Sequence, residues 1–136
     1  MLKINRVSGK GRGLFTMKPV KEGELLEAAP VCSFPSEQRT IIDKTTLFEY
    51  YFVRKSEYTK QTQVDGHIVF GLSSFCNHSN SPNAEVRWVD GENGLLWVHL
   101  IALKDIHADE EVTISYANLD EYPLANKFLD TIPVER

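Results

Sequence analysis

Residues 73–83 read SSFCNHSNSPN and bring many hydrogen-bonding side chains together in one short segment. Three interpretations are open: a surface loop, a metal site, or the floor of a pocket for a polar ligand. The closing Ser-Pro-Asn has the composition of a turn. However, the apolar Phe75 and Cys76 lead directly into Asn77 and His78, which indicates a polar pair anchored from within the body of the protein.

A cysteine beside a histidine suggests metal binding or nucleophilic catalysis. A zinc site needs three or four ligands, yet Cys32 and Cys76 are the only cysteines and show no CxxC spacing. The histidines are scattered along the chain, so we expect no metal site. Cys76 and His78 are two residues apart and would share one face of a strand. A Cys–His nucleophile therefore stays open, although no third partner follows at an obvious spacing.

Two other segments have residue types that could bind or react. Residues 9–13 read GKGRG, and glycines let a backbone turn with positive φ or approach a ligand closely. No dinucleotide or phosphate-binding fingerprint surrounds them, so by themselves they indicate a turn. In VTISYANLDEY, residues 112–122, Tyr116 lies on the apolar parity of a strand. Alone, that position is typical of a core tyrosine whose hydroxyl is satisfied nearby.

The elements that must position these residues are predicted to be mostly short strands. Alternating and continuous apolar runs predict strands at residues 2–7, 14–16, 24–31, 64–70, 84–89, 95–103 and 112–116. The DGENG segment between two of these strands is typical of a hairpin. One helical turn is expected at 71–75. The fold class is therefore mostly β, with several small, irregular sheets.

Residues 36–55 carry conflicting signals. Thr46 and Glu49 have the spacing of a capping box, which favours a helix start. The aromatic run from Phe48 to Val53 instead favours a strand. We expect a helix over residues 36–45 followed by a strand.

Composition limits the classes of function. The chain has 136 residues, 42% hydrophobic and 25% charged, which indicates one globular domain. A net charge of −4 argues against a protein that binds the nucleic-acid backbone directly. The N-terminal residues contain no apolar signal region, and no run reaches transmembrane length. We therefore expect a cytoplasmic or nuclear protein without a secretion signal, a transmembrane segment or membrane association.

Together, three segments resemble a known family in content and order. They are GRG (11–13), FCNHSNSPN (75–83) and ADEEVTISY (108–116). This is the signature of SET-domain proteins, which are protein-lysine methyltransferases that use S-adenosyl-L-methionine. The likeness extends over about residues 3–122. EYYFVRK followed by FGLSSFCNHS is similar to the minimal SET proteins of large DNA viruses.

The resemblance implies a fold and two catalytic tyrosines. The family has a β-clip-like fold of small sheets, with a knot-like crossing that would bring residues 73–83 and Tyr116 together. We expect the SET domain over 1–122 and a docking tail over 123–136. Tyr116 matches the catalytic tyrosine and would also contact the cofactor. Tyr51 matches a second tyrosine of the lysine channel, with Tyr50 as the other register.

The resemblance also implies a cofactor site for S-adenosyl-L-methionine. Gly11, Arg12 and Gly13 match the loop whose backbone follows the methionine part of the cofactor. Asn77 and His78 match the segment whose backbone holds the adenine. The Asn77 side chain would hold the amino-acid end.

The chain departs from the larger family members after its last matching tyrosine. Those enzymes often carry a cysteine-rich, zinc-binding segment there, whereas residues 117–136 contain no cysteine. Tyr122 or Phe128 would then close the cofactor pocket. Ordinary docking of the tail, through Tyr122, Leu124, Phe128 and Leu129, is the alternative.

The expected partner is a protein substrate with an exposed lysine, a histone being one candidate, bound as an added strand. A homodimer is one option for the assembly. The alternative function is a catalytically silent SET fold that acts as a protein-binding module. The presence of Tyr116, Asn77 and His78 favours the enzyme.

Overall fold

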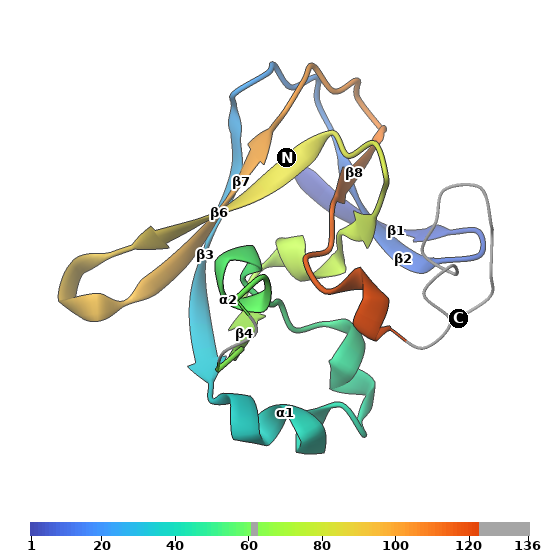
Figure 1. The fold of residues 1–136 in the computed structure, drawn as a ribbon. Coiled ribbons are helices and arrows are strands. Elements are labelled where there is room, and N and C mark those ends of the chain that lie inside the picture. Colours follow the sequence, from blue (N-terminus) through green and yellow to red (C-terminus); the bar gives the residue numbers. More distant parts are fainter. Residues whose placement is uncertain (61–62, 123–136) are drawn as a thin grey trace.

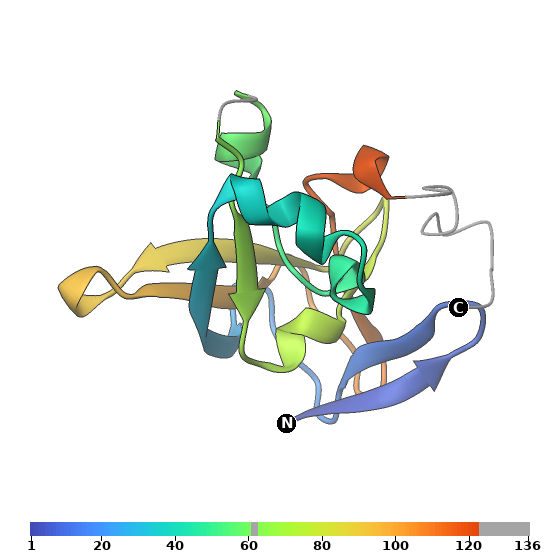
Figure 2. The same ribbon diagram turned by 90° about the horizontal axis from the view of Figure 1, so that it is seen from below.

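Two four-stranded sheets form the body of the protein, seen in a computed structural model that describes residues 1–60 and 63–122. The first sheet has the order β1-β2-β8-β5 and the second the order β4-β3-β7-β6. Short helices lie between them in the chain, and Figures 1 and 2 show the sheets from two directions. The predicted mostly-β fold class is confirmed.

The first sheet contains all three sequence segments of the family signature. Its strands are β1 (Leu2–Val7), β2 (Gly11–Thr16), β5 (Asn77–His78) and β8 (Glu111–Ile114). β1 and β2 form an antiparallel hairpin whose turn places Gly9 at φ 78° and Gly11 at φ 81°. Only glycine adopts such angles at little cost. β8 pairs antiparallel with β2 and parallel with β5, so a strand late in the chain lies between two earlier ones.

The second sheet carries the predicted hairpin. Its strands are β3 (Leu25–Phe34), β4 (Gly66–Val69), β6 (Ala84–Asp90) and β7 (Leu96–Ala102). β6 and β7 pair antiparallel across a turn that contains the short helix η3 (Glu92–Gly94), and the hairpin projects away from the body in Figure 1. Val98 and Leu100 of β7 are fully buried, as expected for a central strand.

The segment over residues 36–55 is helical rather than mixed. A helix forms at α1 (Ser36–Ile42), as predicted, but the strand expected after it is wrong. The chain forms the 3₁₀ helix η1 (Thr46–Glu49) instead, with the Thr45 hydroxyl accepting a hydrogen bond from the Leu47 N–H at 3.2 Å.

The aromatic run over these residues explains the difference. The rings of Phe48 and Tyr51, three residues apart, both turn toward the same cluster, where Tyr51 packs edge-on against Phe34 at 5.2 Å. The run therefore fills a core instead of pairing as a strand, apart from one bridge between Phe52 and His67.

Three further short helices complete the described structure. They are α2 (Lys55–Tyr58), η2 (Leu72–Phe75) and η4 (Leu119–Glu121). The helical turn predicted at 71–75 corresponds to η2. No helix in the described part of the chain is long and apolar enough to cross a membrane. The predicted docking of Leu124, Phe128 and Leu129 lies outside the described residues.

The two sheets share one apolar core, and the signature segments lie beside it. Its buried members come from both sheets and from the chain just before β5: Leu14, Cys76, Ala84, Leu100, Val112 and Ile114. Tyr116 is partly buried and packs against this cluster. The core therefore fixes where the end of β8 meets the start of β5.

Asn83 reinforces the short central strand β8. Its side-chain Nδ2 donates to the Glu111 carbonyl at 2.8 Å, and its Oδ1 accepts from the Thr113 N–H at 2.9 Å. The side-chain amide thus makes the pair of bonds that the backbone of a neighbouring strand would make. Asn83 is only 5% exposed, so water cannot replace these bonds.

We expect Asn83→Ala to lower the free energy of unfolding by at least about 2 kcal/mol, because it leaves two buried backbone groups of β8 without partners. Urea unfolding followed by circular dichroism measures the loss. Asn5→Ala, at an exposed position on β1, is the matched control and should change stability by less than about 0.5 kcal/mol. Equal effects of the two substitutions would contradict this role for Asn83.

Candidate active site

The site is built where residues 76–79 cross the end of β8. The Tyr116 N–H donates to His78 Nδ1 at 3.0 Å, and the Tyr116 hydroxyl donates to the Cys76 carbonyl at 2.7 Å. The Ser79 N–H continues the pairing by donating to the Ile114 carbonyl at 2.9 Å. Two segments almost forty residues apart are therefore joined by hydrogen bonds, and Tyr116 is fixed at both its backbone and its phenol.

The polar residues of SSFCNHSNSPN mainly satisfy one another and the neighbouring strands. Asn77 Nδ2 donates to the Arg12 carbonyl at 3.0 Å and to Glu111 Oε2 at 2.8 Å. His78 Nε2 bonds with Asn80 Oδ1 at 3.0 Å. Asn77 and His78 are buried, so the surface-loop interpretation is wrong for the centre of the segment.

Cys76 lacks the features of a nucleophile. It is buried, and burial raises the pKa of its thiol, with Glu27 and Glu111 adding to the rise. Both ring nitrogens of His78 already bond to other groups. Because the thiolate is the reactive form, the carbonyl of Cys76, rather than its sulfur, is the group that serves the site.

The glycine segment lies directly against this crossing. A Cβ atom on Gly13 would stand 2.6 Å from Glu111 Oε2 and 3.0 Å from Asn77 Nδ2, so only glycine permits this approach. The neighbouring Arg12 places its guanidinium carbon 4.6 Å from the centre of the Phe75 ring. The structure thus places Arg12 and Gly13 against Asn77, while the role of Gly11, Arg12 and Gly13 in holding a cofactor stays a prediction.

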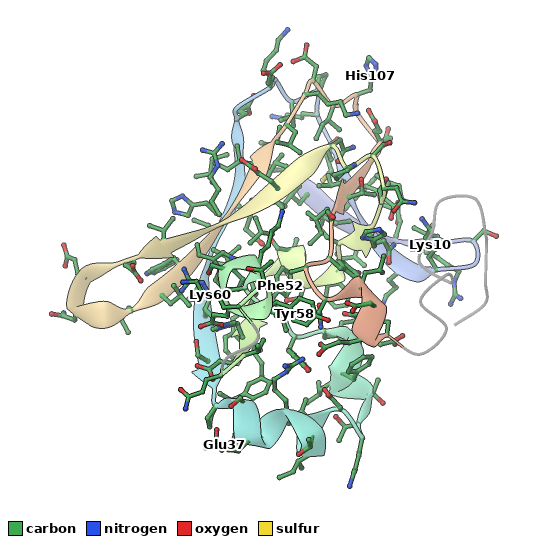
Figure 3. All side chains as sticks on the ribbon, viewed as in Figure 1. Lys10, Glu37, Phe52, Tyr58, Lys60 and His107 are labelled. Atoms are coloured by element: carbon green, nitrogen blue, oxygen red, sulfur yellow. The ribbon has the colours of Figure 1, made fainter. Side chains whose placement is uncertain are left out.

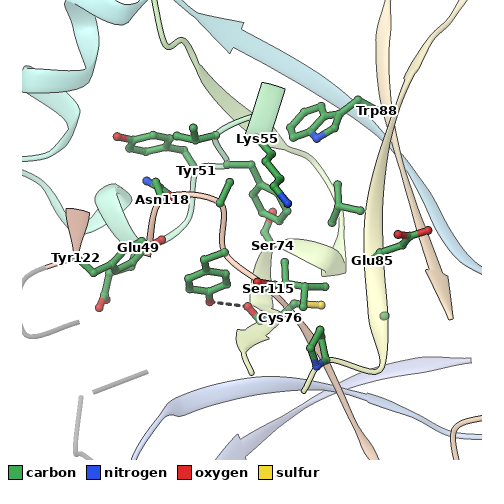
Figure 4. A pocket seen from close by; sticks show the side chains of 18 of the residues that line it. Glu49, Tyr51, Lys55, Ser74, Cys76, Glu85, Trp88, Ser115, Asn118 and Tyr122 are labelled. Atoms are coloured by element: carbon green, nitrogen blue, oxygen red, sulfur yellow. Dashed lines mark hydrogen bonds between the residues drawn. The ribbon is translucent and has the colours of Figure 1, made fainter. Parts of the chain in front are cut away.

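Two cavities meet at Tyr116. The larger has a volume of about 380 Å³, and aromatic and aliphatic side chains such as Phe52, Val86, Trp88 and Leu103 line it (Figure 4). The smaller has a volume of only about 10 Å³, and its lining includes Arg12, Phe75 and Asn77. Four residues line both: Glu49, Ser74, Cys76 and Tyr116. The hydrogen bond from Tyr116 to Cys76, dashed in Figure 4, therefore stands at the boundary between the cavities.

The structure separates the two candidate channel tyrosines. The Tyr51 ring lines the larger cavity, but its hydroxyl donates to Asp43 at 2.6 Å and accepts from Arg39 at 3.1 Å. Burial and the bond to Asp43 raise the pKa of Tyr51 to about 12. Tyr50 lines the smaller cavity, with its ring 5.8 Å from that of Phe75. Tyr50, the alternative that the sequence left open, therefore lines the smaller cavity together with Tyr116. The assignment of Tyr51 to the lysine channel stays a prediction.

Tyr122 covers Tyr116 from the side of the larger cavity. The two rings stack at 5.4 Å with an angle of 29°, and Phe48 lies 4.7 Å from Tyr122 on the other side. Tyr122 lines the larger cavity, whereas the sequence predicted that it closes the cofactor pocket. Phe128, the other candidate, lies outside the described residues.

Side chains that the sequence analysis missed hold Tyr122 in place. Glu121 forms an ion pair with Arg39 of α1, and the Tyr58 hydroxyl of α2 donates to Asp120 at 2.7 Å. These contacts join η4 to two helices that are distant in the chain. These residues lie on short helices that are far apart in the chain, and no sequence pattern indicates that they contact one another.

The sequence model of the SET domain matches residues 11–117. The chain belongs to the SET-domain family. A Schizosaccharomyces pombe SET protein named as an H3 lysine-37 specific histone-lysine N-methyltransferase is 31% identical over 86% of this chain and 74% of its own length.

Other relatives are larger proteins. A Yarrowia lipolytica H3 lysine-36 specific histone-lysine N-methyltransferase is 33% identical over 83% of this chain, but the match spans only 15% of its length. Among solved structures, the Neurospora SET domain protein DIM-5, a histone lysine methyltransferase, has a TM-score of 0.64 at 21% identity, covering 86% of this chain and 52% of that one. A Plasmodium falciparum structure gives 0.62 at 22% identity, covering 85% and 96%. These structures support the SET fold.

Within residues 1–60 and 63–122, no group of three or more His, Cys, Asp or Glu side chains is arranged to hold a metal ion.

His67 supports the wall of the larger cavity. Its Nδ1 bonds with the Ser33 hydroxyl at 2.8 Å and its Nε2 with Glu57 at 3.1 Å, while its ring lies 4.9 Å from that of Trp88. Burial lowers the pKa of His67 and Arg54 lowers it further, whereas Glu57 and Asp65 oppose the shift.

The lowered pKa predicts a loss of stability in acid. The unfolded chain takes up the His67 proton near pH 6.5 and the folded chain only at lower pH, so stability should fall as the pH decreases from about 6.5. Urea unfolding between pH 5 and 8 measures the slope. His67→Gln should reduce this slope, whereas His107→Gln, at an exposed position at the top of Figure 3, should leave it unchanged. Identical slopes for the two variants would show that His67 does not contribute.

Proposed function

We propose that this SET domain is an S-adenosyl-L-methionine-dependent N-methyltransferase that acts on a lysine side chain of a protein substrate. One observation carries the proposal: the Tyr116 phenol, fixed on the Cys76 carbonyl, stands where two cavities of different chemistry adjoin. The smaller cavity is lined by Arg12 and Asn77 of the signature segments, and the larger also by aromatic and aliphatic side chains such as Phe52, Val86 and Trp88. The names of the relatives agree with lysine methylation.

The groups around the smaller cavity, rather than its enclosed volume, suit the proposed cofactor. S-adenosyl-L-methionine supplies a methyl group on a positively charged sulfur. Arg12 is exposed and its guanidinium lies over the Phe75 ring, so it could pair with a carboxylate. The Asn77 side chain and the backbone of Gly11, Gly13 and His78 would hold the remaining polar groups. Tyr116 borders the same cavity.

The larger cavity fits the acceptor lysine. A lysine with a pKa of about 10.4 must lose a proton, which costs roughly 4–5 kcal/mol at pH 7. Phe52, Val86 and Trp88 would shield the lysine from water, and this desolvation lowers its pKa. The Cys76 carbonyl and the oxygen of Tyr116 would then orient the amine by accepting its hydrogen bonds. Such positioning can contribute several kcal/mol to the rate.

The acceptor protein would lie along β6. In the described structure this strand is an edge of the second sheet, and Glu85, Val86 and Trp88 of β6 line the larger cavity. An extended segment could therefore add as a strand beside it. Glu49 and Glu85 place carboxylates in the lining, which suits a basic segment. A histone tail is the first candidate, because several relatives are named for histone lysines.

Cofactor binding is tested by calorimetric titration of S-adenosyl-L-methionine into the protein. We expect saturable heat in the wild type and an affinity about 10- to 100-fold weaker in Asn77→Ala, which loses hydrogen-bonding capacity at the cofactor. Circular dichroism checks that the variant is folded, and Arg12→Ala tests the same pocket from an exposed side chain. Asn5→Ala should bind as the wild type does. No heat with the wild-type protein would argue for the silent binding module.

Catalysis is tested with Tyr116→Phe. We expect turnover with a histone or histone-peptide substrate to fall about 100-fold, since a positioned polar group is lost from the reacting centre. Affinity for S-adenosyl-L-methionine should change little, because the ring and its packing remain. Radiolabelled methyl transfer measures turnover, with Asn5→Ala, at an exposed position on β1, as the control. Unchanged turnover would remove the Tyr116 hydroxyl from the mechanism.

A further inference from the structure

The larger cavity contains a lysine of the chain itself. Lys55 is the first residue of α2 and lines this cavity together with Tyr116. Figure 4 shows its side chain running down from the helix, with the amine on the side of Ser74. No other lysine lines either of the two cavities that adjoin at Tyr116, within the described part of the chain.

The position of Lys55 is set by contacts of the whole helix. Glu57 bonds with the buried His67 at 3.1 Å, and the Tyr58 hydroxyl bonds with Asp120 at 2.7 Å. Arg54, just before the helix, holds its guanidinium 5.3 Å from the Trp88 ring centre. These contacts hold α2 in place, and its first residue, Lys55, lines the cavity while remaining exposed.

The surroundings of the Lys55 amine match those proposed for a substrate lysine. Phe52, Val86 and Trp88 provide apolar and aromatic walls, and Glu49 and Glu85 provide carboxylates in the same lining. Aromatic faces and carboxylates both attract a cationic amine. Lys55 is exposed, so its side chain keeps the freedom to change rotamer toward the shared wall of Ser74 and Cys76.

We propose that Lys55 is an acceptor of methyl groups from its own molecule, an inference that rests on the proposed function. The ammonium first releases a proton to water. The lone pair of Nζ then forms a bond to the methyl carbon of the sulfonium donor as the carbon–sulfur bond breaks. The bonding electrons pass to sulfur, which becomes a neutral thioether, and Lys55 becomes a methylammonium that keeps its positive charge.

The reaction occurs within one molecule because the acceptor is already in the cavity. Tethering converts a bimolecular encounter into a unimolecular one and raises the effective concentration of the amine. Lys55 would also compete with a protein substrate, since both place an amine in the same apolar space. Self-methylation should therefore be fastest when no other substrate is present.

Mass spectrometry of the intact chain tests the proposal after incubation with deuterium-labelled S-adenosyl-L-methionine. We expect labelled methyl groups at Lys55, located by peptide fragmentation, at a rate per molecule that does not change when the protein is diluted tenfold. Lys55→Arg should abolish the label at this position. Lys60→Arg, just beyond α2 and outside both cavities (Figure 3), is the matched control and should leave the label intact.

Mixing two variants separates the reaction within one molecule from a reaction between molecules. Tyr116→Phe retains Lys55 but is expected to be about 100-fold slower, whereas Lys55→Arg retains Tyr116. In a mixture of the two, Lys55 of the Tyr116→Phe chain should stay unlabelled. Label on that chain, or a rate that falls with dilution, would overturn transfer within one molecule.

A histone substrate in a parallel reaction distinguishes failure of this inference from failure of the proposed function. A labelled histone with an unlabelled Lys55 would overturn only the inference. If neither becomes labelled, and titration also shows no binding of S-adenosyl-L-methionine, the proposed function fails with it.

Discussion

The site depends on a four-residue strand that is held from both sides. β8 has β2 on one edge and the two-residue β5 on the other, and so few backbone bonds would hold it only weakly. The buried side-chain amides of two asparagines supply further hydrogen bonds. Asn83 bonds to the backbone of β8, and Asn77 connects β5 to Glu111 and to the backbone of β2. Because an unpaired buried amide is costly, these residues fix one register, and that register sets the position of Tyr116.

A chain of aromatic rings extends this rigidity away from the crossing. His78 contacts Tyr116, Tyr116 stacks on Tyr122, and Tyr122 packs against Phe48. Phe48 in turn meets Tyr51, which belongs to the cluster under α1. The wall of the larger cavity, to which Tyr51 and Val53 also contribute, is therefore continuous with this hydrophobic cluster. The ion pair between Arg39 and Glu121 and the hydrogen bond between Tyr58 and Asp120 attach η4, which directly precedes Tyr122, to α1 and α2.

Features that depend on residues close together in the sequence, or on the order of short motifs, were predictable. DGENG specified the hairpin between β6 and β7, and the order of the three signature segments identified the family. The aromatic run over 48–53 was misleading, because strand preference says nothing about which core the rings fill, and here they fill one from a 3₁₀ helix. Tyr51 was assigned to the channel with Tyr50 as the other register, because the direction of each phenol depends on contacts with other elements, such as those of Tyr51 with Asp43 and Arg39. Likewise, the ion pair between Arg39 and Glu121 joins residues that are far apart in the chain, so no local pattern predicts it.

The placement of β8 between β2 and β5 also determines when the protein can acquire its shape during synthesis. The β1–β2 hairpin and residues 73–83 emerge from the ribosome well before residues 111–116, so each waits with an unpaired edge until their shared neighbour arrives. Pairings between such distant segments are slow to form, and exposed strand edges promote association with other chains. Nascent chains that stall before residue 111 would therefore lack the centre of the first sheet and should be the species most in need of chaperones.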